Sequence, residues 1–167
     1  MNIYGNVAGD HLSPEELKLY NLINQYRNQN GLPSIAASRA LSLVANRHVQ
    51  DLSENVGYLT HAWSDAPYSA GDPSTYPSMW LAPQRFNTGY NGYGYENAYR
   101  HSREATAEGA LNAWKGSPAH NAVILNLNNW QDNYWVTIQG VTEECGFQAL
   151  KILDWYGLSC FGLRSKG

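Results

Sequence analysis

The stretch Trp114–His120 reads WKGSPAH, and a short apolar run follows it. Gly116 suits the left-handed residue that closes a helix, Ser117 is a strong N-cap, and Pro118 fits a first helical position. The pattern predicts that one helix ends and another begins here, with His120 in the first turn of the second. The positive end of that helix disfavours imidazolium, so we expect a neutral imidazole that can bind metal or accept a proton. A cap or packing role is the alternative for this histidine.

Helices are predicted on both sides of this junction. The first helix is predicted to begin at a capping box made by Ser13 and Glu16, with Pro14 at its first position. It is predicted to end at Gly31 and Pro33. A second helix begins near Ser38 and a third covers Arg103–Lys115, while the helix after Ser117 continues to Leu125. The second helix has one core-facing stripe at helical spacing: Leu41, Val44, Ala45, His48 and Leu52. Because His48 lies on that stripe, we interpret it as a packed, hydrogen-bonded core histidine.

The segment 55–101 differs in amino-acid composition from the predicted helices around it. It is dense in Gly, Pro, Ser, Tyr and Asn, and its one expected regular element is a short helix over Pro77–Phe86, interrupted at Pro83. Irregular segments of this length inside a compact domain tend to be functional. A functionless insertion is the alternative interpretation.

The C-terminal part of the chain changes to a strand pattern. Strands are expected over Tyr134–Gln139, Glu144–Leu150 and Trp155–Leu163, where β-branched and aromatic residues alternate with glycine-containing turns. Three short strands after a block of helices predict an α+β domain, with the helices packed on a small, mainly antiparallel sheet. We expect an N-terminal arm over residues 1–12 and a single domain over 13–167.

Composition excludes several classes of function. The 167 residues carry a net charge of −3, which argues against nucleic-acid binding, and no apolar stretch is long enough for a transmembrane span. The first residues lack the pattern of a signal peptide, so the sequence suggests either a cytosolic protein or the mature part of a precursor. Cys145 and Cys160 are the two cysteines, and either a disulfide or two buried thiols fits them.

Three residues form a candidate site. His61 follows the second helix, Glu96 precedes the third, and His120 lies in the first turn of the next. Two imidazoles and a carboxylate suit zinc with an open position, or an acid–base pair. Spacing alone does not bring the three together.

The order of motifs adds a family resemblance. The chain resembles the CAP superfamily (cysteine-rich secretory proteins, antigen 5 and pathogenesis-related 1), in its bacterial SCP-like branch. The matching motifs are Asn24–Arg27 with Gly31–Pro33, then Thr60-His61, Tyr95–Asn97, Ala110–Trp114, Ser117–His120 and Ile124-Leu125. The resemblance covers roughly residues 13–163.

The resemblance implies a three-layer α-β-α sandwich with a central cleft lined by two histidines and two acids, which holds zinc in several family members. Carried over, His61 and His120 would be the metal ligands and Glu96 one acid. The family's second acid is a glutamate, and this chain offers only Asp65 or Asp72 in its place. Tyr95 also stands where the family usually has glycine, and Asn121 where bacterial members often have arginine.

Three functions are compatible with this sequence. The first is a secreted binding module whose cleft can also hold a divalent metal and takes a lipid, sugar or peptide against the aromatic-rich segment 63–99, with Trp63, Tyr95 and Asn97 in its wall. The second is a metal-assisted hydrolase or peptidase with Glu96 as general base on a metal-bound water. The third is a structural or adhesive domain whose His/Glu cluster is a hydrogen-bonded polar core. We favour the first, because no G-x-S-x-G or H-E-x-x-H motif is present.

Overall fold

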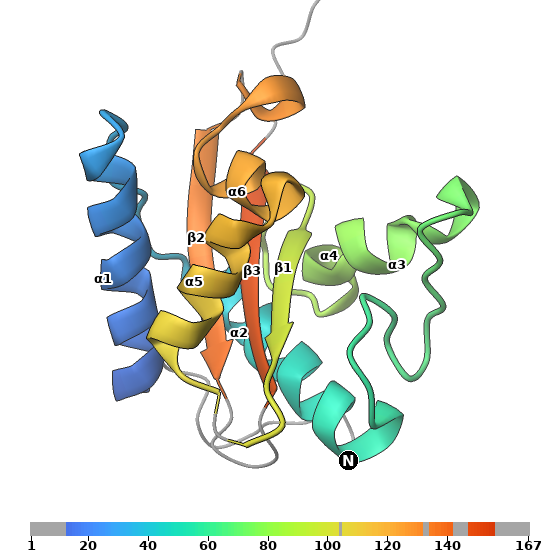
Figure 1. Ribbon diagram of the computed structural model, residues 1–167. Helices are drawn as coiled ribbons and strands as arrows, with labels where there is room; N and C mark the ends of the chain where they lie inside the picture. Colours follow the sequence, from blue (N-terminus) through green and yellow to red (C-terminus); the bar gives the residue numbers. More distant parts are fainter. Residues whose placement is uncertain (1–12, 104, 132–133, 142–146, 156–167) are drawn as a thin grey trace, which may run out of the picture.

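A three-stranded antiparallel sheet lies at the centre of the fold, with helices on both of its faces (Figure 1). The computed structural model describes residues 13–103, 105–131, 134–141 and 147–155. The strands are β1 (Tyr95–Arg100), β2 (Tyr134–Val141) and β3 (Phe147–Trp155), in the order β1-β3-β2. The register of β1 against β3 runs from Tyr95 opposite Ile152 to Arg100 opposite Phe147. β1 is therefore an edge strand.

The helices complete a three-layer α-β-α sandwich, as the family resemblance implied. In Figure 1, α1, α5 and α6 cover one face of the sheet, and α2 lies behind it, packed against β2 and β3. The short helices α3 and α4 flank β1 at the side. Among the described residues, no helix is long and apolar enough to cross a membrane. The helical elements are α1 (Pro14–Gln29), α2 (Arg39–Asp51), the π-helical turn η1 (Leu52–Val56), η2 (Pro73–Thr75), α3 (Pro77–Trp80), α4 (Ala82–Arg85), α5 (Ala107–Gly116), α6 (Pro118–Ile124) and η3 (Asn128–Trp130).

Helix α1 begins as the sequence predicts. The Ser13 hydroxyl accepts from the backbone N–H of Glu16, and the Glu16 carboxylate accepts from the backbone N–H of Ser13, which closes a capping box. Glu15, in the same turn, accepts a hydrogen bond of 2.9 Å from the backbone N–H of Ala107. Helix α5 begins at Ala107 and not at the expected Arg103, because Thr106 is its N-cap and accepts from the backbone N–H of Gly109, while Glu15 satisfies a further N–H of the first turn.

Two polar residues of α1 hold the loop that follows α1 and the loop that follows α6. The Asn24 amide both donates to the carbonyl of Ile35 and accepts from its N–H. The Arg27 guanidinium donates from Nη1 to the carbonyl of Ile124 and to Asn126 Oδ1, both at 2.6 Å, and from Nε to the carbonyl of Pro33. Burial lowers the pKa of Arg27 to about 10. The N-x-x-R pattern thus ties both its own following loop and the distant loop after α6 to one helix.

The apolar core is divided between the two faces of the sheet. On the front face, α1, α5 and α6 contribute a cluster that includes Leu19, Ile23, Trp114 and Ile124. On the opposite side, α2 and the η1 turn that follows it bury side chains at the spacing expected for one face of a helix: Leu41, Val44, Ala45 and Val49 from α2 and Leu52 from η1. His48 lies on the same stripe and is fully buried, which confirms its assignment as a core histidine.

The predicted junction between two helices within Trp114–His120 is confirmed, but the first of these helices ends differently from the prediction. Gly116 does not adopt a left-handed conformation; it is the last residue of α5, and Ser117 is both the C-cap of α5 and the N-cap of α6. The Ser117 hydroxyl does not cap the backbone. It lies 2.8 Å from Nδ1 of His120, which occupies the third position of α6 as expected.

The strand prediction is right about the sheet and wrong in two details. β1 lies inside the segment that was expected to be irregular. The sequence pattern does not reveal this strand, because it forms by pairing with β3, about fifty positions later. β3 also runs through the break predicted between Leu150 and Trp155. The arm at residues 1–12, the ends of the two predicted strands at 144–146 and 156–163, and both Cys145 and Cys160 lie outside the described residues.

Candidate ligand cleft

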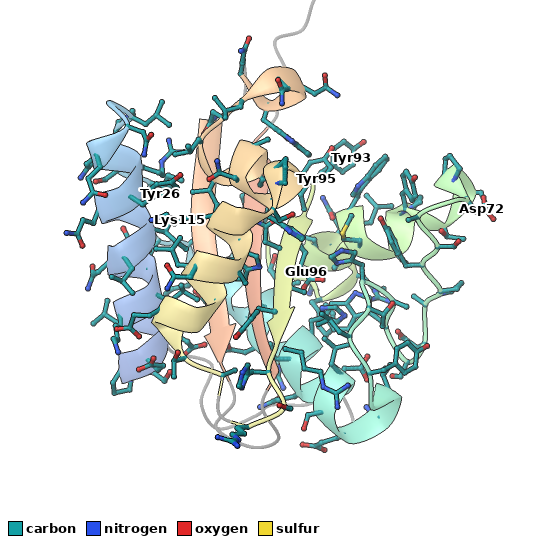
Figure 2. All side chains as sticks on the ribbon, in the orientation of Figure 1. Tyr26, Asp72, Tyr93, Tyr95, Glu96 and Lys115 are labelled. Carbon is teal, nitrogen blue, oxygen red and sulfur yellow. The ribbon has the colours of Figure 1, made fainter. Side chains whose placement is uncertain are left out.

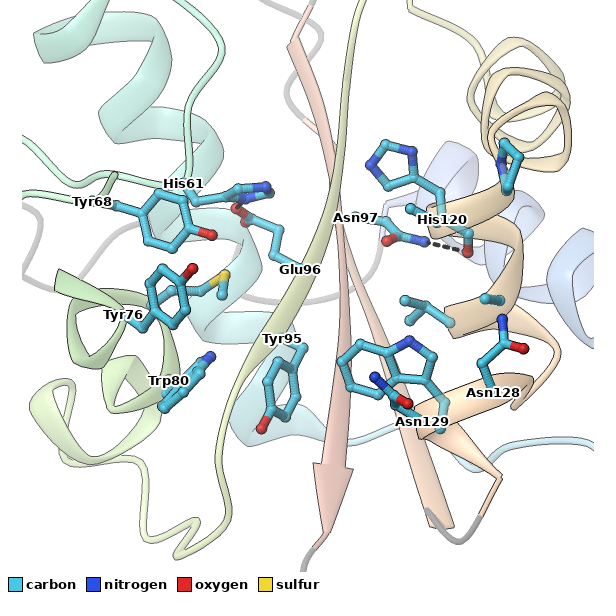
Figure 3. Close-up of a pocket in the computed structure, with 16 residues that line it drawn as sticks. His61, Tyr68, Tyr76, Trp80, Tyr95, Glu96, Asn97, His120, Asn128 and Asn129 are labelled. Carbon is cyan, nitrogen blue, oxygen red and sulfur yellow. Dashed lines mark hydrogen bonds and ion pairs between the residues drawn. The ribbon is translucent and has the colours of Figure 1, made fainter. Parts of the chain in front are cut away.

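A cavity of about 560 Å³ opens beside β1, between the α3 segment on one side and α6 with η3 on the other (Figure 3). This volume lies within the usual range for small-molecule sites. The residues that line it combine aromatic rings, amides and two imidazoles with a few small apolar side chains. They are His61, Tyr68, Tyr76, Met79, Trp80, Tyr95, Glu96, Asn97, Pro118, Ala119, His120, Ala122, Val123, Asn128, Asn129 and Trp130.

Glu96 lies at the floor of this cavity between two histidines. Its Oε1 is 2.6 Å from Nδ1 of His48, and its Oε2 is 2.8 Å from Nδ1 of His61. The side chains of His48 and Glu96 are fully buried, whereas the side chain of His61 is 29% exposed. The carboxylate therefore links a buried helix on one face of the sheet to a histidine that faces the cleft.

Counting hydrogens assigns roles within this cluster. Nε2 of His48 lies 3.0 Å from the carbonyl oxygen of Ala62, which can only accept, so this nitrogen carries a hydrogen. One further hydrogen then lies between His48 Nδ1 and Glu96 Oε1, because two atoms that both only accept would not lie 2.6 Å apart. Glu96 Oε2 accepts from Nδ1–H of His61, so in neutral His61 the other nitrogen, Nε2, is a free acceptor. This nitrogen has no hydrogen-bond partner among the described residues.

His120 faces the same cavity from the first turn of α6. Its Nδ1 contacts the Ser117 hydroxyl, and its backbone carbonyl accepts a 3.2 Å hydrogen bond from the buried side chain of Asn97. Burial, and secondarily the nearby charge of His61, lowers the pKa of His120 from its ordinary value of 6.5. His120 is therefore a neutral imidazole near pH 7.

The donor set provides two ligands for a metal ion and lacks a third. His61 and His120 each keep Nε2 without a partner in the described part of the chain, and the carboxylate behind His61 is of the kind that orients metal-binding histidines. Within the described part of the chain, however, no group of three or more His, Cys, Asp or Glu residues could hold an ion. Catalytic zinc sites usually supply three protein ligands, so these residues do not fit that class.

A second cavity, of about 400 Å³, continues the cleft past the histidines. It shares His61, Tyr68 and His120 with the first, and its other lining residues are Leu59, Thr60, Ala70 and Ala98. The two imidazoles thus border both cavities.

Comparison with known proteins assigns this architecture to a family. The sequence model of the cysteine-rich secretory protein family, CAP, matches residues 20–131, well over half of the chain. The chain belongs to the CAP family. A comparison with curated protein sequences gives no match.

Solved structures share the CAP fold with this chain at low sequence identity. An extracellular protein containing an SCP domain from Bacillus anthracis is 22% identical, with a TM-score of 0.60 over 86% of this chain and 44% of that one. A cysteine-rich secretory protein from Staphylococcus aureus is 13% identical, with a TM-score of 0.60 over 90% and 42%. An outer surface protein from Borrelia burgdorferi is 19% identical, with a TM-score of 0.58 over 86% and 94%. This chain spans less than half of the first two proteins.

Two acids expected in the cleft of this CAP domain lie elsewhere. Asp65 does not line either cavity; it pairs with Nη1 of Arg85 at 2.9 Å. Asp72 caps the 3-10 turn η2 by accepting from the N–H of Ser74, and Figure 2 shows it at the outer tip of its segment, away from Glu96. Each aspartate has a local partner that its short side chain reaches without entering the cleft. The buried partner of Glu96 is instead His48.

The aromatic wall also differs from its prediction. Tyr95 and Asn97 line the cavity as expected, but Trp63 is only 3% exposed and packs against His48 and Phe86 in the core behind it. The residues that extend the wall were not singled out from the sequence: Tyr68, Tyr76, Trp80 and Trp130. The abundance of tyrosine and tryptophan, 12 and 6 residues, was the available signal, and it does not say which rings share a surface.

Proposed function

We propose that this CAP domain is a binding module that holds a small organic ligand in the cleft beside β1. The observation that carries the proposal is that one cavity combines a row of half-buried aromatic rings with amides and two imidazoles whose Nε2 atoms have no described partner. Mostly apolar walls with a few convergent polar groups are typical of ligand sites.

We further propose that the domain acts outside the cell. The structural relatives are described as an extracellular protein and an outer surface protein, which supports this location. We expect antibody detection and protease accessibility to find the protein in the medium, or on the surface of intact cells, of the organism that produces it. Retention in the cytosol would contradict it.

Binding rather than hydrolysis is favoured by the position of Glu96. Both of its oxygens contact imidazole nitrogens, and its side chain is fully buried, so it is not placed to take a proton from water in the cleft. Orientation of His61 is the role that this geometry supports.

A divalent ion on Nε2 of His61 and His120 is a separate proposal, supported by the fact that both histidines line the same cavity. Zinc would there serve as a ligand contact and not as the centre of a hydrolytic reaction. Calorimetric titration with zinc near pH 7 should give micromolar binding that disappears in His61→Ala and in His120→Ala. His101→Ala, at an exposed histidine outside both cavities, is the control. Equal heats in all four proteins would contradict the proposal.

The ligand-binding proposal is tested by filling the cleft. Ala119 lines the cavity and is exposed, so Ala119→Trp should occupy the cavity without disturbing the core. Ala113 is exposed on α5 outside both cavities, so Ala113→Trp is the matched control. Ligand-observed NMR against neutral oligosaccharides, dodecyl detergents and short peptides should show a binder with the wild type and Ala113→Trp. That signal should be lost in Ala119→Trp. No binder in any class, or equal binding by Ala119→Trp, would overturn the proposal.

A further inference from the structure

The wall of the cleft is a continuous row of five aromatic rings. Tyr68 stacks on Tyr76 with centroids 5.4 Å apart, and Tyr76 contacts Trp80 at 5.4 Å. The ring centroids of Trp80 and Tyr95 are 5.8 Å apart, and those of Tyr95 and Trp130 are 5.1 Å apart. All five rings line the cavity and are neither fully buried nor fully exposed. Each is therefore held by its neighbours while part of it borders the space a ligand would fill.

The polar groups beside this row are neutral amides. The side chains of Asn128 and Asn129 are exposed and have no hydrogen bond to the described part of the chain, and both line the cavity next to Trp130. An amide offers both donors and acceptors, which matches hydroxyl groups, since these also do both. The row and the amides thus present complementary surfaces for the C–H faces and the O–H groups of a sugar ring.

The charge of the cleft argues against an anionic ligand. No lysine or arginine is among its described lining residues, and the one carboxylate there is engaged by two histidines. Fatty acids, phospholipids and sulfated glycans carry anionic groups that proteins usually bind with arginine or lysine. A neutral ligand fits better.

The edge of β1 argues against a peptide added as a further strand. The carbonyl of Ala98 already accepts from Nε1 of Trp114, and the N–H of Gly94, just before the strand, donates to the carbonyl of Trp80. Strand addition needs a row of free backbone groups along such an edge. These two positions are already occupied by other parts of the chain.

The loop that carries the amides is fixed before any ligand arrives. Arg27 holds the carbonyl of Ile124 and the side chain of Asn126, and Asn126 and Asn128 both adopt positive φ, at 52° and 55°. Asparagine tolerates this conformation better than most residues. A loop fixed in this way lowers the ordering cost of binding.

We propose that the cleft binds a neutral, linear oligosaccharide, with sugar rings lying on the aromatic row and hydroxyl groups bonded by Asn128 and Asn129. The inference rests on the proposed binding function and names its ligand class. The aromatic row is longer than one sugar ring and a second cavity shares His61 and His120 with the first, so affinity should rise with chain length.

Calorimetry with glucose and N-acetylglucosamine oligomers of one to six units, in α- and β-linked series, tests the inference. One series should bind the wild type with affinity that increases with length. Trp130→Leu and Trp80→Leu should weaken that binding at least tenfold, whereas Trp130→Phe, which keeps a ring, should retain most of it. Tyr58→Leu, at an exposed tyrosine outside both cavities, is the control, and circular dichroism verifies that each variant is folded.

The outcomes separate this inference from the proposed function. If a dodecyl detergent or a peptide binds instead, and Ala119→Trp or Trp130→Leu removes that binding, the oligosaccharide inference is overturned and the binding function stands. If nothing in the three ligand classes binds, both are overturned. Oligosaccharide binding that is equal in Trp130→Phe and Trp130→Leu would also contradict the aromatic row as its platform.

Discussion

His120 is neutral in the folded protein because its imidazole is half-buried and close to His61. With its folded pKa below 6.5, the unfolded state binds more protons between these two pKa values. The free energy of unfolding should therefore decrease as the pH falls below about 6.5. Urea unfolding at pH 7.5, 6.5 and 5.5 should show a smaller decrease for His120→Asn than for the wild type. A parallel decrease in both proteins would show that other groups cause it.

Glu96 presents an oxygen to each of two imidazoles, and a glutamine can offer a donor and an acceptor at the same two points. Its amide N–H can donate to Nδ1 of His48, and its carbonyl can accept from Nδ1–H of His61. Glu96→Ala should therefore lower the free energy of unfolding by about 1–3 kcal/mol more than Glu96→Gln does, because it leaves a buried nitrogen without a partner. Chemical denaturation measures the difference. Equal losses would show that the charge, and not the hydrogen-bond pattern, stabilises the cluster.

Arg27 is the residue of α1 on which the loop between α6 and η3 depends. Its rigid guanidinium reaches three acceptors at once, and an ammonium cannot reproduce that geometry. Arg27→Lys should lower the free energy of unfolding by about 2 kcal/mol, in the range of hydrogen bonds to charged groups. It should also weaken any ligand contact made by Asn128 and Asn129.

Arg39 provides the matched control for this change. It is exposed on α2, so Arg39→Lys should alter stability by less than about 0.5 kcal/mol. Equal effects of the two substitutions would contradict the anchoring role of Arg27.

Helix α1 and the α5–α6 junction show what local sequence can predict. The capping box at Ser13, the N-cap at Ser117 and the position of His120 were all predictable, because caps and first turns depend on neighbours within a few residues. The family resemblance correctly implied the layer order, and with it a cleft that brings His61, Glu96 and His120 together.

Strand β1 and the partners of the cleft residues show where that approach fails. β1 exists because it pairs with a strand about fifty residues later, and Glu96 is held by His48 at a separation of 48 positions. The prediction that Asp65 or Asp72 serves as the second acid of the cleft fails for a similar reason, because the conformation of the folded loops determines which partners these side chains reach. Long-range pairing is not encoded in any short window of sequence.

Apolar clusters on both faces of one sheet stabilise the whole molecule. Ile23 belongs to the front cluster and Leu41 to the cluster of α2, and both are fully buried. Ile23→Val should cost about 0.5–1.5 kcal/mol and Leu41→Ala about 2–5 kcal/mol. Because the sites share no partner, the double variant should lose the sum within about 0.5 kcal/mol.

Urea unfolding followed by fluorescence and by circular dichroism measures these losses. A single transition with coinciding curves is expected if the sheet couples both clusters into one cooperative unit. Two transitions in the double variant would show that the layers unfold separately.

The aromatic row is divided between rings that the core constrains and rings that it leaves free. Tyr95 and Trp130 also pack against the front cluster, whereas Tyr68, Tyr76 and Trp80 belong to none of the described core clusters. Mutations at the last three can therefore accumulate during evolution with little loss of stability. We expect homologues to keep the ring positions nearest η3 and to diverge at the α3 end, so that new ligand preferences arise there while the scaffold is inherited unchanged.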